Sequence, residues 1–439
     1  MNLPSHIQQH FSQIPEFDLE AFESLEAGNF PTSIRLNPGK LNVSPYQGSN
    51  IQHEASAFVL NERPNFGNDP LWHAGAYYVQ ESASMLAGAI AQQVLSDHTQ
   101  PLVLDLCAAP GGKSTHLASA IHPHGFLVAN EVIQSRHSIL KENLKKWGSD
   151  AVATTQRDPE WFGEQTPHAF DFILVDAPCS GEGLFRRDPK AMEEWSEANV
   201  NLCSARQKRI VMDVWGALKP GGFLVYSTCT FNRSENEDNV AFFAEETGAV
   251  VVTSQFEFLE PERINAEKTG FRFTPYSGPN EGFFLAVLQK PEESLKSKKM
   301  GPAKWNEVKS EKFPSFLSQF SLNERKIIET PVGWVSVPAE FLPLIHHLKP
   351  SSWGGILGTM KGKDFIPEET SALLLGFQPE NALELDLEWA LKFLQGETQL
   401  PLSGTQGWKT ITYQNVPLGW VKEIGNRMNN YWPKGWRKR

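Results

Sequence analysis

The stretch PLVLDLCAAPGGKST, residues 101–115, decides how the centre of this chain folds. A short apolar run leads into a turn of small residues and glycines, and a helical pattern begins at Ser114. Small residues let the backbone approach a bound ligand, and the amide groups at a helix N-terminus bind carboxylate or phosphate. The stretch therefore predicts a strand, a ligand-binding turn and a helix.

The same alternation continues along the chain. Further apolar runs predict strands at residues 126–131, 151–156, 170–176 and 223–227, and residues 250–253 and 282–289 could complete the sheet. Helical patterns lie between these strands at residues 133–147 and at about 190–218, and a turn at residues 219–222 is expected to end the second helix. Ser234 and Glu237 form a capping box, which predicts the start of a further helix. Fully apolar strands alternating with helices predict a parallel sheet covered on both faces, with ligands at the carboxyl ends of its strands.

A phosphate loop is the first alternative for the glycine-rich turn. Gly112, Lys113 and Ser114 fit the end of the G-x-x-x-x-G-K-[ST] pattern, but Cys107 stands where its first glycine belongs. That glycine helps a tight loop wrap around phosphate, and no independent magnesium-binding aspartate follows a strand. The sequence therefore disfavours a nucleotide triphosphatase.

Acidic residues follow three successive predicted strands. Glu131 ends the second strand, where it could hold ribose hydroxyl groups, Asp158 follows the third strand, and Asp176 ends the fourth. Glu131 and Asp158 could instead cap helices. Three carboxylates in matching positions favour a nucleoside ligand that carries a cationic sulfonium, which is S-adenosylmethionine.

Two of the four cysteines also follow strands. Cys179 comes after the fourth strand and Cys229 after the fifth, whereas Cys203 falls within a helical pattern. Since no spacing fits a disulfide scaffold or a zinc site, we expect no metal and treat these two as reactive thiols. A thiolate that adds to carbon 6 of cytosine makes carbon 5 nucleophilic enough to take a methyl group. The residues alone leave open which of the two thiols attacks.

Three motifs resemble the Nop/Sun family of RNA 5-cytosine methyltransferases: DLCAAPGGK at 105–113, DAPCSGEG at 176–183 and STCTFNRSENE at 227–237. The resemblance implies that Cys229 is the nucleophile and that Cys179 assists release of the methylated RNA, with Asp176 and Lys113 as further catalytic candidates. The implied S-adenosylmethionine contacts are Cys107, Ala108, Ala109, Pro110, Gly111, Gly112, Lys113, Glu131, Asp158 and Asp176.

The resemblance extends to both ends of the chain. SIRLN at 33–37 is similar to the N-terminal RNA-contacting strand of the family, so Arg35 is a candidate phosphate contact. The C-terminal region is similar to that of the bacterial RsmF-like branch, which methylates small-subunit (16S) ribosomal RNA and carries a PUA-like RNA-binding module. Seven of the thirteen tryptophans lie in this region, and we expect Trp436 with Lys434 to contact RNA.

The overall charge restricts where RNA could bind. The formal net charge is −11, so phosphates would have to meet local basic sites, such as the terminal residues 434–439, rather than a broadly basic surface. The chain has 40% hydrophobic and 21% charged residues, no apolar run long enough to span a membrane and no signal peptide. We therefore expect a cytoplasmic protein that has no membrane partner. We also expect it to be a monomer.

The fold class expected is α/β: a Rossmann-like S-adenosylmethionine-dependent methyltransferase core with an N-terminal RNA-binding segment and C-terminal small α+β and PUA-like β-barrel domains. The expected boundaries are 1–72 for the N-terminal RNA-binding domain, 73–290 for the catalytic domain, 291–312 for a linker, 313–375 for a first C-terminal domain and 376–439 for the PUA-like domain. Two alternatives stay open: a transfer RNA substrate, and a non-catalytic RNA-binding factor of ribosome assembly.

Overall fold

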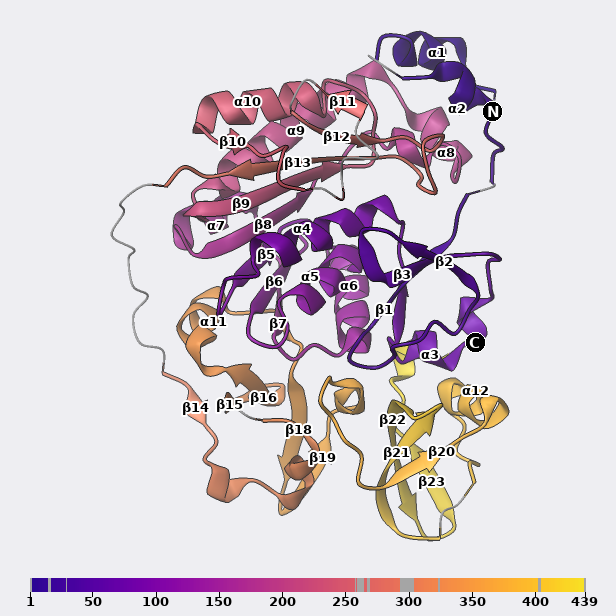
Figure 1. Cartoon of the computed structure of the whole chain (residues 1–439). Helices are drawn as coiled ribbons and strands as arrows, with labels where there is room; N and C mark the ends of the chain where they lie inside the picture. The colour runs from indigo at the N-terminus through magenta and orange to yellow at the C-terminus, as the bar shows by residue number, and fades with distance from the viewer. Residues whose placement is uncertain are drawn as a thin grey trace.

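The computed structural model describes residues 2–14, 17–28, 30–256, 258, 264–266, 269–292, 304–322, 324–401 and 404–437, with only the backbone described for 264–266. Four sheets are present in this part of the chain. Figure 1 shows the two C-terminal sheets, in orange and yellow, below the strands of the central sheet, and the N-terminal helices α1 and α2 close to α8 at the opposite end.

The central sheet has the strand order β11-β12-β13-β9-β8-β5-β6-β7-β17, and β10 pairs with β13. The pairs β7–β6, β6–β5, β5–β8 and β8–β9 are parallel, whereas β13 joins β9 antiparallel. The strands are β5 (Leu102–Asp105), β6 (Phe126–Asn130), β7 (Val152–Thr155), β8 (Phe170–Asp176), β9 (Leu218–Thr228), β10 (Val250–Val251), β11 (Ile264–Ala266), β12 (Gly270–Phe273) and β13 (Phe283–Gln289). The predicted Rossmann-like core is confirmed.

Helices cover both faces of this sheet. Neighbouring residues of one strand, Val103 and Leu104, belong to two different apolar clusters, as strand geometry requires when both faces are buried. One cluster contains residues of α7 (Pro159–Gln165), α9 (Glu197–Trp215) and α10 (Glu237–Thr247). The other contains residues of α4 (Leu86–Val94), α5 (Gly112–Ala120) and α6 (Gln134–Trp147).

Two local predictions near the end of the core are wrong. Residues 219–222 do not close a helix as a turn; they lie inside β9, and the preceding helical stretch is divided into α8 (Pro189–Glu194) and α9. Ser234 does not cap α10, because that helix begins at Glu237 after Asn236, and the cap makes no side-chain hydrogen bond. The side chains around this turn serve the candidate site instead, as described below.

The N-terminal region forms two short helices and a sheet. The sheet has the order β2-β3-β1-β4. Its elements are α1 (Ser5–Phe11), α2 (Leu19–Ser24), β1 (Ser33–Leu36), β2 (Gly48–Ile51), β3 (Glu54–Leu60), α3 (Pro70–His73) and β4 (Tyr77–Val79). The helices α1 and α2 pack through Ile7, Phe11 and Phe22 against Phe185 and Phe231 of the core.

Arg35, on β1, is buried and does not reach the surface. Its guanidinium donates to Gln80 Oε1 at 3.0 Å, Gly112 O at 3.2 Å and Thr115 Oγ1 at 2.7 Å, and its Cζ lies 4.5 Å from the ring centroid of Trp147. The predicted phosphate contact is therefore wrong for this structure. Arg35 instead fastens the N-terminal sheet to the start of α5.

The C-terminal region contains two sheets, β14-β15-β16-β18-β19 and β20-β21-β22-β23. Their elements are β14 (Asn306–Glu307), β15 (Arg325–Thr330), β16 (Gly333–Pro338), α11 (Leu342–Leu348), β17 (Ser352–Trp353), β18 (Ile356–Lys361), β19 (Asp364–Pro367), β20 (Ala382–Glu384), α12 (Leu387–Gln395), β21 (Gly407–Tyr413), β22 (Val416–Ile424) and β23 (Arg427–Asn430). β21 and β22 pair antiparallel, but the last sheet is a path with β20 and β23 at its ends, so the predicted closed barrel is not confirmed.

The predicted domain boundaries stay a prediction. Residues 293–303 of the expected linker lie outside the described residues, and residues 306–307 form β14, which pairs with β15. From the first C-terminal region, β17 pairs with β7 and so adds a strand to the central sheet. Within the described parts of the chain, none of the helices has the length and apolar character needed to span a membrane.

The burial of Arg35 predicts a role in stability. Replacing Arg35 with alanine would leave Gln80 and Thr115 without their partner and remove the support of Trp147, so we expect a loss of about 2–3 kcal/mol in the free energy of unfolding. Urea unfolding followed by circular dichroism measures this. Replacing the exposed Arg63 with alanine is the control and should leave the midpoint almost unchanged. An unchanged midpoint for Arg35→Ala, with weakened RNA binding, would contradict the structural role.

Candidate active site

Cys179 and Cys229 meet at the carboxyl edge of the central sheet. Cys229 directly follows β9, and Cys179 lies three residues after the end of β8. Both thiols are free and half-buried, and their Sγ atoms are 3.1 Å apart. The expectation that these two cysteines emerge at one edge of the sheet is confirmed, and both sulfurs can reach the same bound molecule.

The environment of Cys179 keeps its thiol protonated. Its hydrogen bond with Cys229, together with burial, raises the pKa of Cys179 well above the ordinary value for a thiol. A protonated Cys179 can therefore carry a proton beside the sulfur of Cys229.

A carboxylate and an ammonium group stand beside the thiols. Asp176 Oδ2 accepts from Lys113 Nζ at 2.9 Å, and its Oδ1 accepts from Ser227 Oγ at 2.8 Å. Burial alone would lower the pKa of Lys113, but the Asp176 carboxylate, with Cys229 and Glu81, raises it above its ordinary value. A charged Lys113 fixes the orientation of Asp176 and supplies positive potential close to Cys229.

Glu182 ties the two cysteine loops together, and sequence reasoning missed it. Its buried carboxylate accepts from the backbone N–H groups of Phe231 at 2.7 Å and Asn232 at 2.9 Å, and it contacts His10 Nε2 at 3.0 Å. Burial alone would raise the pKa of Glu182, but the hydrogen bonds from His10 and Phe231 hold it below the ordinary value. The contact with His10 links helix α1 directly to the site.

Glu235 forms a second buried network that the sequence analysis did not identify. Its carboxylate accepts from Ser180 N at 3.1 Å, Gln207 Nε2 at 2.7 Å and Asn232 Nδ2 at 2.7 Å. Burial raises the pKa of Glu235 despite these hydrogen bonds. Glu182 and Glu235 both lie inside the quoted cysteine motifs, which was the signal that could have identified them.

A cavity of about 410 Å³ opens over the two sulfurs. Lys113, Asp176, Cys179 and Cys229 line it, together with Pro110, Arg136 and Phe283 among others. Gly183 lies on its wall, where a side-chain Cβ would come within 2.9 Å of Cys229 O, so no larger residue fits without moving the Cys229 loop. This volume lies in the range of ligand pockets, roughly 300–1,000 Å³.

The glycine-rich turn forms the neighbouring wall. Gly111, with φ of +113°, precedes α5, and the carbonyl groups of Ala109 and Pro110 accept from Arg136 and Asn143. Ala108, Ala109 and Gly111 are buried, Gly112 and Lys113 are half-buried, and Pro110 is exposed. Cys107 is half-buried, burial raises the pKa of its thiol, and it does not line the cavity over the other two sulfurs.

The acids at the strand ends fit a polar ligand to different degrees. Glu131 is buried at the end of β6, and its Oε2 makes no hydrogen bond among the described residues, with only an ion-pair contact to Arg136 at 3.3 Å. Asp158 precedes α7, is exposed and makes no side-chain cap. Asp105, not selected from sequence, is fully buried with Oδ1 unpartnered among the described residues, and burial raises its pKa to about 7. Unpartnered buried carboxylate oxygens at Glu131 and Asp105 fit a ligand that donates hydrogen bonds.

The predicted RNA contacts Lys434 and Trp436 do not line the cavity over the two thiols. Lys434 is exposed, and Trp436 is half-buried, with its ring centroid 5.5 Å from that of Trp432. Lys146 Nζ of α6 lies 5.0 Å from the Trp436 ring centroid. Trp436 therefore packs against the catalytic core as well as against its own region.

Three family models match the chain in succession. One, described as the N-terminal domain of 16S rRNA methyltransferase RsmF, matches residues 3–82; one described as 16S rRNA methyltransferase RsmB/F matches residues 92–289; and one described as the methyltransferase RsmF PUA domain matches residues 380–438. The middle match covers both cysteine loops and the glycine-rich turn.

Whole-chain relatives agree with these matches. Ribosomal RNA small subunit methyltransferase F of Shewanella loihica is 32% identical over 85% of this chain and 80% of its own length, and that of Psychromonas ingrahamii is 30% identical over 92% and 90%. A crystal structure of a methyltransferase homologue from Pyrococcus horikoshii superposes with a TM-score of 0.52 and 26% identity, over 62% of this chain and 88% of that chain. The chain belongs to the RsmB/F family of 16S rRNA methyltransferases.

Proposed function

We propose that this protein transfers a methyl group from S-adenosylmethionine to carbon 5 of a cytosine in 16S ribosomal RNA, with Cys229 as the covalent nucleophile. The observation that carries the proposal is the 3.1 Å approach of the Cys179 and Cys229 sulfurs on the wall of one cavity. Methylation at oxygen, nitrogen or the 2′-hydroxyl needs no thiol, whereas methylation at carbon 5 of cytosine does.

The first step is attack by Cys229 on carbon 6 of the flipped cytosine. A bond forms between Sγ and carbon 6, and electron density moves to carbon 5, which becomes the nucleophile for the methyl group. Lys113, held 2.9 Å from Asp176, adds positive potential beside the attacking sulfur. S-adenosylmethionine supplies an electrophilic methyl group when bound.

Release requires loss of the proton from carbon 5. The C5–H electrons then re-form the double bond between carbons 5 and 6, and the Cys229 thiolate leaves with the electrons of the S–C6 bond. We assign Cys179 to this stage because its sulfur is adjacent to that of Cys229. In this step the Cys179 thiol passes its proton to the departing Cys229 sulfur and takes up the proton from carbon 5, so that both thiols end protonated.

Asp176 acts on the ring rather than on carbon 6. Its orientation is fixed by Lys113 and Ser227, so its carboxylate can stabilise a protonated pyrimidine ring while the adduct exists. This role leaves Cys229 to form the covalent bond.

The proposed S-adenosylmethionine site comprises the turn from Cys107 to Lys113 with Glu131, Asp158 and Asp176. Glu131 would accept from ribose hydroxyl groups through the oxygen that has no hydrogen bond among the described residues, and the start of α5 would face the methionine carboxylate. Asp158, exposed after β7, would address the adenine amine.

The names of the relatives point to RNA of the small ribosomal subunit as the substrate. The PUA region would add RNA contacts at its exposed basic end, where Lys434 lies beside Trp436. We further propose that the protein acts as a monomer.

The roles of the two thiols are tested by trapping the adduct. Cys179→Ala should accumulate a protein–RNA complex that survives denaturing gel electrophoresis, because attack proceeds and release is impaired. Cys229→Ala should form no such complex, because the attacking sulfur is missing. Incubation with labelled 16S RNA and S-adenosylmethionine, followed by a denaturing gel, measures both.

Cys203→Ala is the matched control, since Cys203 is buried within α9 and does not line the cavity. Cys203→Ala should methylate the RNA and form as little stable protein–RNA complex as the unaltered protein does. A stable complex with Cys229→Ala and none with Cys179→Ala would reverse the assignment. Absence of a complex from both variants, while methylation continues, would exclude covalent catalysis by either thiol.

The cofactor assignment is tested at Glu131. Glu131→Gln keeps the side-chain shape and its contact with Ile133 N but removes the charge, so we expect roughly a tenfold increase in the dissociation constant of S-adenosylmethionine. Isothermal titration calorimetry gives the value. Glu160→Gln, an exposed position on α7, should leave affinity unchanged; equal affinities for the two variants would remove Glu131 from the site.

A further inference from the structure

Two further cavities continue from the one that holds the cysteines. The catalytic cavity shares Glu81, Arg187 and Glu281 with a neighbouring cavity of about 400 Å³. That cavity shares Arg63 and Val79 with a third, of about 460 Å³. Because they share these residues, the three cavities are neighbours in a row that starts at the reactive thiols, and we call this row the groove.

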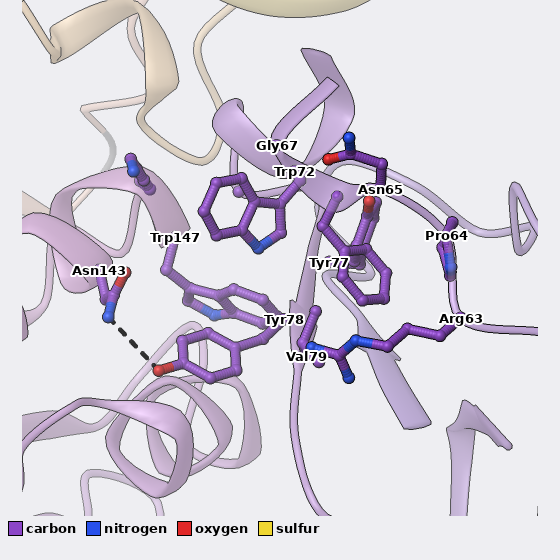
Figure 2. Close-up of a pocket in the computed structure, with 13 residues that line it drawn as sticks. Arg63, Pro64, Asn65, Gly67, Trp72, Tyr77, Tyr78, Val79, Asn143 and Trp147 are labelled. Atoms are coloured by element: carbon purple, nitrogen blue, oxygen red, sulfur yellow. Dashed lines mark hydrogen bonds between the residues drawn. The ribbon is translucent and has the colours of Figure 1, made fainter. Parts of the chain in front are cut away.

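Five of the thirteen residues that line the third cavity have aromatic side chains. Its lining residues belong to α3, β4, α6 and the loop before α3. Figure 2 shows the rings of Trp72, Trp147 and Tyr78 on one side, with Arg63 and Asn65 on the other. We call this the aromatic cavity; its lining residues include Arg63, Asn65, Phe66, Trp72, Tyr77, Tyr78, Asn143, Lys146 and Trp147.

Asp69 holds part of this wall in place. Its Oδ2 accepts from Tyr77 Oη at 2.6 Å, and its Oδ1 accepts from Leu71 N at 2.9 Å, which caps the helix that carries Trp72. Burial, with Asp69 beside it, raises the pKa of Tyr77, so its hydroxyl remains a donor to Asp69. The wall is therefore arranged before any ligand binds.

Asn143 connects the aromatic cavity to the glycine-rich turn. Its Nδ2 donates to Pro110 O at 2.8 Å and approaches Tyr78 Oη at 3.4 Å. Trp147, only 1% exposed, forms the floor and is supported by the buried Arg35 at 4.5 Å. A molecule in this cavity would therefore lie against the same helix, α6, that supports the turn at the catalytic cavity.

Cations stand along the groove. Lys146 Nζ lies between two tryptophans, 5.1 Å from the ring centroid of Trp72 and 5.0 Å from that of Trp436. Arg63 is exposed at the junction between the second and third cavities, and Arg187, exposed at the junction with the catalytic cavity, pairs with Glu281. Both guanidinium groups lie over the ring of Phe30, at 6.0 and 4.7 Å from its centroid.

We propose that the aromatic cavity holds an unpaired nucleobase of the RNA substrate, from a nucleotide that flanks the target cytosine in the same single-stranded segment. The proposal rests on the proposed function. Aromatic rings stack on bases of any sequence, amides such as Asn65 can bond a base edge, and Arg63 and Arg187 can meet the phosphates between the two bases.

Continuity with the thiols favours RNA over another occupant. A protein partner would need an apolar surface patch, whereas here the aromatic rings line a recess that leads by charged residues to the reaction site. A strand of RNA with one base at Cys229 must leave the catalytic cavity in some direction, and this groove offers it aromatic and cationic side chains.

The test is a scan of abasic nucleotides. A fragment of 16S RNA that the unaltered protein methylates is prepared with one base removed at each position on either side of the target cytosine. Fluorescence anisotropy gives the dissociation constant of each fragment. We expect one position at which base removal weakens binding roughly tenfold to a hundredfold. In Trp72→Ala the intact fragment should bind about as weakly as that abasic fragment, and base removal there should have little further effect.

Two matched variants accompany Trp72→Ala. Trp215→Ala removes another half-buried tryptophan with a lysine 5.6 Å from its ring centroid. Trp215 packs on the opposite face of the central sheet from Trp147, so this variant should keep the full sensitivity. Arg63→Ala should weaken binding of every fragment by a similar factor and reduce the salt dependence, as expected for a phosphate contact.

A crosslink keeps the test decisive if Trp72→Ala fails to fold. 4-Thiouridine is placed at the sensitive position, or at each flanking position in turn, and irradiated with the unaltered protein. Crosslinked peptides containing Trp72, Tyr77 or Tyr78 support the proposal. Insensitivity to every base removal, sensitivity that Trp72→Ala leaves intact, or crosslinks only outside the aromatic cavity would overturn it. Failure to methylate the intact fragment would instead refute the proposed function, since the scan begins from a methylated fragment.

Discussion

The parallel pairing of β8 with β9 is the constraint on which the site depends. Its register places Asp176 opposite Ser227, so the loops that follow the two strands start side by side. Cys179 and Cys229 then lie 3.1 Å apart, although 50 residues separate them in the chain. Because both strands are buried in the middle of the sheet, this register cannot slip without moving apolar side chains out of the core.

Two buried carboxylates maintain the loops after the strands end. Burying a carboxylate is costly unless it is hydrogen-bonded, and Glu182 and Glu235 each accept several hydrogen bonds from the loops that carry the thiols. Glu182 also contacts His10 of α1, so the order of the catalytic loops depends on the docking of the N-terminal helices. The N-terminal region therefore contributes to the site through packing as well as through the groove that it lines.

The sequence was informative where function depends on short local motifs. Periodicity and the post-strand positions of Cys179, Cys229 and Glu131 were sufficient to predict the parallel core and the edge that carries the site. Contacts between distant segments were not predictable. Arg35 was predicted to contact phosphate, but its partners Gly112 and Thr115 belong to α5, which packs on the central sheet. The addition of β17 to the central sheet and the packing of Trp436 on Lys146 likewise depend on tertiary contacts that no local pattern records.

We propose that the two loops after β8 and β9 form a site for methylation of cytosine carbon 5 in 16S RNA. To test this, the purified protein is incubated with methyl-labelled S-adenosylmethionine and with small ribosomal subunits, naked 16S RNA or transfer RNA from cells that lack the gene, and the labelled nucleoside is identified after digestion. We expect label in 5-methylcytidine, with the small subunit or its RNA as the best acceptor. Label in any other nucleoside, or preference for transfer RNA, would contradict it.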